Sequence, residues 1–484
     1  MKLNNPELLR SQCLINGEWC DALSGKREAV INPATGAELA SIPLVSEEET
    51  QQAIAAAQRA QNDWKQLTAK QRSALLLVWA DQVLAAQEDL AQLMTAEQGK
   101  SLAEARGEVA YAASFITWFA EEAKRVDGAV LQAPQASQRL VVVKQPIGVC
   151  AAITPWNFPA AMITRKVAPA LAAGCAIIVK PAEQTPLTAL ALAKLAQDAG
   201  IPAGVLQVVT GEAAQVGKVL CDSPVVRKLS FTGSTEVGRI LMAQCAPSIK
   251  KLSLELGGNA PVIVFDDANL DAAVAGIMAS KFRNSGQTCV CANRIYVQDG
   301  IYERLAEKLV AAVEQLKVGD GSQEGTTQGP LIDSDAVAKV QSHIDDALIK
   351  GAQIATGGQP HALGGTFFQP TVVTGVTQKM RFAKEETFGP VAPLFRFHDE
   401  AEAIAMANDT EFGLAAYLFT QNAARQWRVP EALEYGMVGI NTGLISNEVA
   451  PFGGVKQSGL GREGSRYGIE EYLELKYLCI DVSR

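Results

Sequence analysis

The 484-residue chain is predicted to be an α/β protein with two α/β domains. From about residue 140 onward, short runs rich in β-branched residues alternate with Ala-rich helical stretches, which is typical of βαβ units on a parallel sheet. A second series of the same kind begins at "PVIVF", residues 261–265. The length and the 48% apolar composition are sufficient to bury the cores of several domains.

The N-terminal region precedes this alternation. Its opening "CLINGEWCDALSG" predicts short strands joined by turns. Two helices are expected next, because each begins with a capping box. Ser46 with Glu49 opens "SEEETQQAIAAAQRAQNDW", and Thr68 with Gln71 opens "TAKQRSALLLVWADQVLAAQ".

The first α/β series contains the predicted strands "LVVVKQPIGVCAAIT", "AIIVKP", "VLQVVTG", "KLSFTG" and "KKLSLELGG". Helical stretches such as "TALALAKLAQDAG" and "STEVGRILMAQCA" lie between them. A junction at 256–260 leads to the second series, with "RIYVQ", the helix "YERLAEKLVAAVEQL", "GGTFFQPTVV" and "APLFRF".

Two β-rich segments, "ASQRLVVVKQ" and "LELKYLCIDV", lie at the edges of these blocks. Edge strands need covering or pairing, and another subunit can provide it. We therefore expect a first domain from 1–124 and 146–256, a second from 257–440, and a small β-rich oligomerisation element from 125–145 and 468–484.

Composition excludes several classes of partner. The net charge of −9 disfavours binding to a nucleic-acid backbone, which needs a basic face, and no polybasic patch for membranes is present. No apolar run approaches the roughly 18 residues of a spanning helix. The polar start "MKLNNPELLRSQ" lacks the apolar core of a signal peptide, so we expect a cytoplasmic protein.

Cysteine and histidine usage predicts neither a disulfide framework nor a metal site. The nine cysteines are an odd number and mostly isolated in apolar contexts, so most are expected to be packed residues. They lie at positions 13, 20, 150, 175, 221, 245, 289, 291 and 479. His343, in "QSHIDD", is expected on an exposed helix face, His361 in a loop and His398 at a strand end. The CxC pair lacks the second pair of ligands that zinc requires.

Two strand ends are candidates for binding a dinucleotide. In "SFTGSTEVGR", Gly233 and Ser234 join a strand to a helix with Gly238 in its first turn, where backbone N–H groups can approach a phosphate. The buried strand in "AIIVKPAEQTP" delivers Lys180 and Glu183 to its carboxyl end. Taken singly, each segment is also consistent with an ordinary turn.

Three further residues are candidates for catalysis. Cys289 in "NSGQTCVCANR" is a candidate nucleophile, which needs either a lowered thiol pKa or a nearby base. No histidine lies in a suitable context, so Glu255 in "LELGGNAP" is the leading base. Asn157 in the stiff segment "TPWNFP" can donate to an oxyanion. A strand end and a tight turn are the structural alternatives for Glu255 and Asn157.

The segments "TPWNFP", "KPAEQTP", "FTGSTEVG", "ELGGNAP", "GQTC" and "EETFGP", in this order and spacing, resemble the aldehyde dehydrogenase superfamily. The resemblance covers essentially the whole chain. The longer segments "KFRNSGQTCVCANR" and "EYGMVGINTGLISNEVAPFGGVKQSGLGREGS" resemble its succinate-semialdehyde dehydrogenase branch, which includes glutarate-semialdehyde dehydrogenases. This implies the aldehyde dehydrogenase fold, with two Rossmann-like domains, and a homodimer or homotetramer.

The resemblance assigns catalytic roles. Cys289 would attack the aldehyde, and its backbone N–H and the Asn157 amide would stabilise the oxyanion. Glu255 would activate the water that hydrolyses the thioester, a role that a CoA-acylating variant would not need. Acyl transfer from Cys289 and a non-enzymatic role on the same fold are the alternatives from other classes.

The resemblance also assigns the cofactor site, for NAD or NADP and without a metal. Its residues would be Gly233, Ser234 and Gly238 at the pyrophosphate, Lys180 and Glu183 at the adenine ribose, Trp156 along the cleft, Glu386 at the nicotinamide ribose and Phe388 beside the ring. Glu183 is a departure from the Ser typical of NADP-preferring bacterial members. A carboxylate accepts from free ribose hydroxyls and repels a 2′-phosphate, so we favour NAD, with dual use left open by Lys180.

The substrate implied is succinate semialdehyde, oxidised to succinate, with glutarate semialdehyde or a broader range of aldehydes as alternatives. An ω-carboxylate needs cationic or hydrogen-bonding partners. Arg165 and Arg283 are the candidates, with Ser446 added by the resemblance; an ion pair is the alternative for each arginine. One methylene is worth only about 1–3 kcal/mol, so chain length stays open.

Cys291 keeps two interpretations. It is either a small residue packed behind Cys289 or a resolving thiol that forms a reversible disulfide with it.

Overall fold

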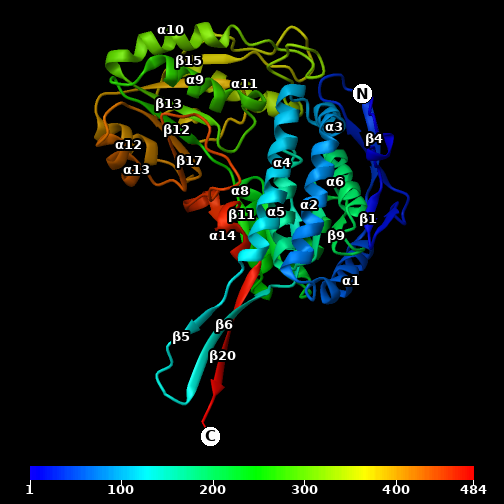
Figure 1. Cartoon of the computed structure of the whole chain (residues 1–484). Helices are drawn as coiled ribbons and strands as arrows, with labels where there is room; N and C mark the ends of the chain where they lie inside the picture. The colour runs from blue at the N-terminus through cyan, green and yellow to red at the C-terminus, as the bar shows by residue number, and fades with distance from the viewer. Residues whose placement is uncertain (484) are drawn as a thin grey trace.

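The computed structural model describes residues 1–483, and two large β-sheets carry most of its helices (Figure 1). The first sheet has eight strands in the order β19-β11-β10-β7-β8-β9-β1-β2. Its bounds are β1 Cys13–Ile15, β2 Glu18–Cys20, β7 Val149–Ile153, β8 Ile177–Lys180, β9 Leu206–Val208, β10 Val226–Thr232, β11 Lys251–Glu255 and β19 Gly459–Leu460. The five central strands are parallel, and β1, β2 and β19 are antiparallel additions. The predicted parallel α/β unit is thus confirmed.

Helices cover both faces of this sheet. The four N-terminal helices are α1 Glu47–Trp64, α2 Ala69–Ala85, α3 Gln87–Gln98 and α4 Leu102–Glu122. The crossover helices are α5 Ala161–Ala173, α6 Pro186–Asp198, α7 Ala213–Asp222 and α8 Thr235–Cys245. One core lies under α2 to α6 and contains Trp64, Trp79 and Phe119, while a second lies under α1, α7 and α8. The capping boxes predicted for α1 and α2 are both present, with a third at the start of α4.

The second sheet has seven strands in the order β14-β15-β16-β13-β12-β17-β18, parallel except for the edge strand β14. Its strands are β12 Ala260–Val264, β13 Ala292–Gln298, β14 Gln353–Thr356, β15 Thr371–Val376, β16 Val391–Phe397, β17 Ala415–Phe419 and β18 Met437–Ile440. Its helices are α9 Leu270–Lys281, α10 Tyr302–Val313, α11 Ser334–Ile349, α12 Glu400–Asn408 and α13 Arg425–Ala432. The second α/β series predicted from the sequence is therefore confirmed.

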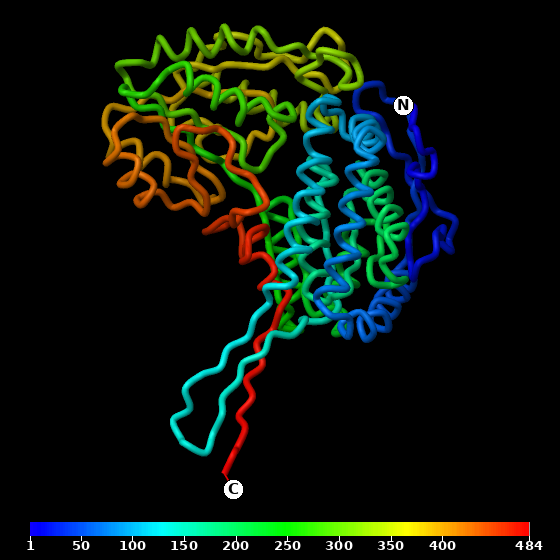
Figure 2. Tube along the Cα trace, viewed as in Figure 1, coloured from blue at the N-terminus to red at the C-terminus, as the bar shows by residue number. Residues whose placement is uncertain are grey.

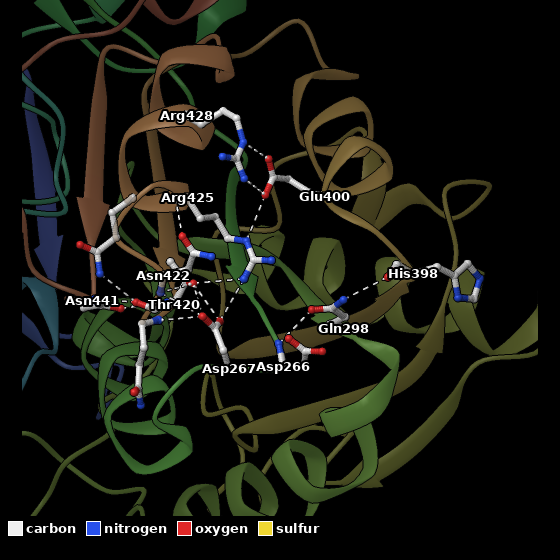
Figure 3. Close-up of polar contacts among 12 residues, drawn as sticks. Asp266, Asp267, Gln298, His398, Glu400, Thr420, Asn422, Arg425, Arg428 and Asn441 are labelled. Atoms are coloured by element: carbon white, nitrogen blue, oxygen red, sulfur yellow. Dashed lines mark hydrogen bonds and ion pairs between the residues drawn. The ribbon is translucent and has the colours of Figure 1, made fainter.

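A polar cluster occupies the carboxyl ends of β12 and β17 (Figure 3). Asp267 accepts a hydrogen bond of 2.8 Å from the Thr420 hydroxyl and one of 3.1 Å from Arg425 Nη1. Arg425 also donates to Glu400 across 3.0 Å, and Arg428 donates to the same carboxylate across 2.6 Å. These hydrogen bonds and ion pairs engage the polar side chains at the carboxyl ends of the two strands. They also tie α12 and α13 to the sheet.

A three-stranded antiparallel arm projects from the body, with the C-terminus at its tip (Figures 1 and 2). It consists of β5 Ala129–Leu131, β6 Gln138–Pro146 and β20 Leu473–Asp481, in the order β20-β6-β5. Its apolar side chains include Val130, 80% exposed, and Leu475, 69% exposed. Strands β3 Arg27–Ile31 and β4 Glu38–Pro43 form a separate hairpin, and α14 Ser465–Glu470 leads into the arm.

We propose that the three sheets mark three structural units. The ranges expected from the sequence need two extensions, because β19 follows residue 440 yet pairs with β11 of the first sheet, and β6 extends one residue past 145. Among residues 1–483, we find no helix with the length and apolar character needed to cross a bilayer.

The exposed position expected for His343 is wrong. The side chain is fully buried on α11, with Nδ1 3.1 Å from the Thr387 hydroxyl and its ring edge-on to Phe382. His343 belongs to the buried stripe of this helix, together with Val340 and Ile344. The polar residues around His343 in the sequence conceal this stripe, and its side chain packs in the core of the second sheet.

Candidate active site

A cavity of about 280 Å³ contains the catalytic residues predicted from the sequence. Its walls come from both large sheets, at the carboxyl ends of β7, β10 and β11 and from loops of the second sheet. This is where open α/β sheets place their ligands. The predicted residues that line it are Trp156, Asn157, Gly233, Ser234, Glu255, Cys289, Glu386 and Phe388.

Glu255 is the last residue of β11 and is only 3% exposed. Neither of its carboxylate oxygens has a hydrogen-bond partner within the described residues. Burial raises the pKa of Glu255 well above its usual value, and the negative charge of Glu463 raises it further. A buried carboxyl with a raised pKa, open to a cavity, is suited to act as a general base near neutral pH.

Arg165 and Lys166, in the first turn and a half of α5, pair with Glu463. Arg165 Nε lies 2.6 Å from a Glu463 oxygen, and the guanidinium also lies over the Phe452 ring at 4.0 Å. Arg165 is 2% exposed and lines neither this cavity nor the one described below. The ion pair weighed as the alternative for Arg165 is therefore present.

Hydrogen bonds hold both the side-chain amide and the backbone carbonyl of Asn157. Its side-chain Nδ2 donates to the carbonyl of Gln287 across 3.1 Å. Its own carbonyl accepts from Lys100 Nζ at 2.8 Å and from Asn284 Nδ2 at 3.0 Å. Lys100 is in turn paired with the buried Glu108. The amide of Asn157 is thus directed toward the loop that carries Cys289.

Cys289 follows a tight turn, η4 (Arg283–Gly286), in which Asn284 and Ser285 have positive φ values of 49° and 53°. A Cβ on Gly286 would lie 2.1 Å from the carbonyl oxygen of Gly389, so only glycine fits there. The Cys289 side chain is partly exposed to the cavity. Burial raises its pKa to about 12, which keeps the thiol protonated at neutral pH and means that it needs a base to become a nucleophile.

The residues predicted for the nicotinamide end of the cofactor also line this cavity. Trp156 and Phe388 meet edge-on with ring centroids 5.6 Å apart. Burial raises the pKa of Glu386 to about 7, and this carboxylate accepts from the Gly258 N–H at 3.2 Å. A Cβ on Gly257 would lie 3.0 Å from a carboxylate oxygen of Glu386, so a larger residue there would crowd this side chain.

The residues predicted for the adenine ribose, Lys180 and Glu183, lie at a neighbouring hollow. Lys180 is 2% exposed and forms an ion pair with Glu183, which lines a cavity of about 560 Å³ together with Glu28. Ser234 caps α8 by accepting from the Val237 N–H, so the N-terminus of this helix opens at the cavity. Gly238 does not line the cavity; it allows α8 to pack closely on Leu256.

These residues fit a nicotinamide dinucleotide. A helix N-terminus suits a pyrophosphate, the carboxylates suit ribose hydroxyls, and the aromatic pair suits a flat ring. Within residues 1–483 no group of three or more Cys, His, Asp or Glu side chains is arranged to hold a metal ion.

A second cavity of about 450 Å³ adjoins the first at the Asn157–Phe158 segment, since Asn157 lines one and Phe158 the other. It brings together the predicted substrate residues Arg283 and Ser446. The Arg283 guanidinium lies 4.7 Å from the Phe158 ring and has no carboxylate partner in the described part of the chain. An unpaired guanidinium beside a cavity is suited to bind an anion.

Sequence reasoning missed several residues of this region: Lys100, Glu108, Tyr111, Lys166 and Glu463. Glu463 lies in "GREGS", part of a segment on which the resemblance rests, so the sequence offered a signal for this residue. The others lie on α4, on α5 or just before α4, and no local pattern distinguishes them from core helix residues.

Comparison with known proteins agrees with this geometry. The aldehyde dehydrogenase family model matches residues 19–478. A succinate-semialdehyde dehydrogenase [NADP(+)] of Escherichia coli is 65% identical over 99% of this chain and 100% of its own length. A glutarate-semialdehyde dehydrogenase of Pseudomonas putida is 64% identical over the full length of both chains.

Solved structures lead to the same result. The crystal structure of succinate-semialdehyde dehydrogenase from Burkholderia pseudomallei has a TM-score of 0.99 at 64% identity and covers 100% of both chains. The fold predicted from the sequence is confirmed, and the chain belongs to the aldehyde dehydrogenase family.

Proposed function

We propose that this NAD(P)+-dependent aldehyde dehydrogenase oxidises succinate semialdehyde to succinate, with water as the second substrate. One observation carries the proposal: Cys289 and Glu255 line one cavity, and Arg283 and Ser446 line the cavity that adjoins it. An aldehyde at the Cys289 sulfur can therefore direct a carboxylate at its other end toward a free guanidinium. The semialdehyde branch of the resemblance and the names of the two relatives support the same substrate class.

The first step is thiol attack. Glu255 accepts the proton of the Cys289 thiol, and the sulfur forms a bond to the carbonyl carbon. The oxyanion that develops is stabilised by the Asn157 amide, which already faces the Cys289 loop through Gln287. Lys100 and Asn284 keep this amide in position because they bind the Asn157 carbonyl.

When bound, the nicotinamide dinucleotide accepts the hydride that leaves the substrate carbon. Ser234 and the α8 N-terminus would hold its pyrophosphate, Lys180 and Glu183 its adenine ribose, and Glu386, Trp156 and Phe388 its nicotinamide end. Cys289 then carries the acyl group as a thioester. After Glu255 has released the first proton to solvent, it removes a proton from the water that attacks this thioester. The carbon–sulfur bond then breaks, the carboxylic acid leaves, and Glu255 returns this proton to the Cys289 sulfur.

For the cofactor we favour NAD over NADP. Lys180, the cation available for a 2′-phosphate, is already paired with Glu183, and this carboxylate would repel the phosphate. The same carboxylate can accept hydrogen bonds from the free hydroxyls of the NAD ribose. The E. coli relative is named for NADP(+), so the identity of residue 183 is the feature to test.

Glutarate semialdehyde is the alternative substrate, because the Pseudomonas putida relative is named for it. A difference of one methylene is worth about 1–3 kcal/mol, and a 450 Å³ cavity accommodates either chain. The exposed apolar arm formed by β5, β6 and β20 supports assembly into a homodimer or homotetramer, since β5 and β20 are unpaired edges.

The experiment is a kinetic panel without CoA. Succinate semialdehyde, glutarate semialdehyde, butanal and pentanal are compared with NAD+ and NADP+, and reduced cofactor is followed by absorbance. We expect both semialdehydes to be preferred over the uncharged aldehydes of equal length, through a lower KM. Equal kcat/KM values for charged and uncharged aldehydes would contradict the proposal.

A further inference from the structure

Tyr111 carries a buried hydroxyl group that no described residue satisfies. It lies on α4 and lines the second cavity together with Arg283 and Ser446. Its Oη is shielded from solvent and has no hydrogen-bond partner in residues 1–483. A buried hydroxyl without a partner costs free energy, and such groups are rare in native proteins unless something outside the chain satisfies them.

The ring that carries this hydroxyl has a fixed position. Tyr111 packs edge-on against Phe115, one turn later on α4, with ring centroids 4.9 Å apart. One turn earlier, Gly107 also lines the cavity, and a Cβ placed on it would meet nothing within 4 Å. Because i−4 and i lie on the same face of a helix, the space above Tyr111 is left open on the cavity side.

The charges around the cavity favour an anion beside this hydroxyl. Burial raises the pKa of Tyr111, while the positive charges of Arg165 and Arg283 act in the opposite direction. The hydroxyl therefore keeps its proton at neutral pH and can donate it in a hydrogen bond. The carboxylates in this region are already engaged. Glu108 pairs with Lys100, and Glu104 accepts from the Asn284 N–H at 2.7 Å. Glu463, whose negative charge also raises the pKa of Tyr111, pairs with Arg165 and Lys166.

We propose that Tyr111 is a specificity-determining residue whose hydroxyl donates a hydrogen bond to the ω-carboxylate of the substrate, alongside Arg283 and Ser446. An ionised carboxylate offers about four lone-pair positions, enough for a guanidinium and two hydroxyls at once. Arg283 supplies charge, and the two hydroxyls select for an acceptor at the end of the chain. This inference rests on the proposed function, because it requires a substrate with a carboxylate at the end opposite the aldehyde.

The test is Tyr111→Phe, which removes only the hydroxyl and keeps the ring that packs on Phe115. Loss of a hydrogen bond to a charged group lowers affinity by about tenfold to a hundredfold. We expect kcat/KM for succinate and glutarate semialdehydes to fall by about this factor, mainly through KM, while butanal is oxidised as before. Tyr467→Phe is the matched control, because Tyr467 is 51% exposed and lines neither cavity; it should change neither value.

A second measurement isolates carboxylate binding from turnover. Succinate should inhibit butanal oxidation by binding at the same carboxylate site. Tyr111→Phe should weaken this inhibition by the same factor. Melting temperatures of both variants establish that the fold is retained.

The outcomes separate this inference from the function on which it rests. If Arg283→Ala lowers the preference for semialdehydes over butanal and Tyr111→Phe does not, the role of Tyr111 is wrong and the proposed function stands. An equal loss on both classes of aldehyde in Tyr111→Phe also overturns it. If Arg283→Ala leaves the preference for semialdehydes over butanal unchanged, the proposed carboxylate-binding site, and with it the proposed function, is wrong.

Discussion

Lys281 Nζ lies 3.3 Å from Cys291 Sγ, and both side chains are fully buried next to the loop that carries Cys289. Lys281 also donates to Asn293 Oδ1 at 2.9 Å, so the amine joins the end of α9 to the start of β13. Burial raises the pKa of the Cys291 thiol, with Lys281 acting in the opposite direction. A buried, protonated thiol reacts slowly with an oxidised neighbour.

We therefore predict that Cys291 is a packing residue. After mild peroxide treatment and then reductant, Cys291→Ala should regain the same fraction of its activity as the wild type. The measurement is residual dehydrogenase activity before and after reduction. Full recovery of the wild type with poor recovery of Cys291→Ala would instead establish the resolving thiol that the sequence leaves open.

A second prediction concerns the pH dependence of turnover. Glu255 acts as a base only when ionised, so its raised pKa moves the rising limb of kcat to higher pH. Glu463 is the second cause of that increase, after burial. In Glu463→Gln the pKa of Glu255 should fall, and the rising limb should shift to lower pH.

The control is Glu470→Gln, whose carboxylate pairs with Lys144 at the surface. It should leave the pH profile of kcat in place. Glu463→Gln should also melt at a lower temperature, because it leaves two buried cations without their counterion. A rising limb that stays at the wild-type pH, or moves to higher pH, would show that Glu463 does not act on the base.

The third prediction concerns the cofactor. Glu183→Ser removes the carboxylate that repels a 2′-phosphate and releases Lys180 to bind it. The ratio of kcat/KM for NADP to that for NAD should increase, by about tenfold for each 1.4 kcal/mol of repulsion removed. A wild-type enzyme that clearly prefers NADP would defeat this role of Glu183, as would a ratio that Glu183→Ser leaves unchanged.

The fourth prediction concerns stability. Burial lowers the pKa of His343 from 6.5 to about 4, with Arg381 and Lys339 acting in the same direction and Glu385, 3.3 Å from Nε2, opposing them. The unfolded chain therefore binds more protons than the folded one between these two pKa values, so stability falls as pH is lowered through this range. The loss is about 3 kcal/mol, from about 1.4 kcal/mol for each pKa unit.

Denaturant unfolding at about pH 7 and about pH 4 measures this loss of stability. The decrease in unfolding free energy should be smaller in His343→Gln than in the wild type by about that amount. An equal decrease in both proteins would place the acid sensitivity on other groups.

The sequence predicts the architecture well because the signals are local. Apolar β-rich runs, Ala-rich helices and the capping boxes of Ser46 and Thr68 each lie within one element. The presence of Cys289 and Glu255 in one cavity is different, since they lie 34 positions apart on either side of the predicted domain junction. Their spacing alone does not imply contact: the lack of a suitable histidine made Glu255 the leading base for Cys289, and the resemblance to a known family gave the pair its roles.

Tertiary contacts account for what was missed or incomplete. His343 is buried because the segment around Thr387 covers it, and Arg165 faces Glu463 from nearly 300 positions away. Tyr111 looks like any aromatic residue of a buried helix until the cavity beside it is known. Local sequence periodicity and residue propensity do not predict such contacts between segments that are distant in the sequence.

The central claim is that Cys289 carries the acyl group and Glu255 directs water to it. The most direct measurement is the intact mass of Glu255→Gln after mixing with succinate semialdehyde and NAD+, together with the reduced cofactor released in the first turnover. The account predicts that the variant releases its first reduced cofactor more slowly than the wild type, because the thiol has lost its base, that turnover falls by about 10²–10⁴-fold, and that a succinyl group is found on Cys289. Sustained turnover of this variant at the wild-type rate, or an acyl group that is also present in Cys289→Ala, would contradict it.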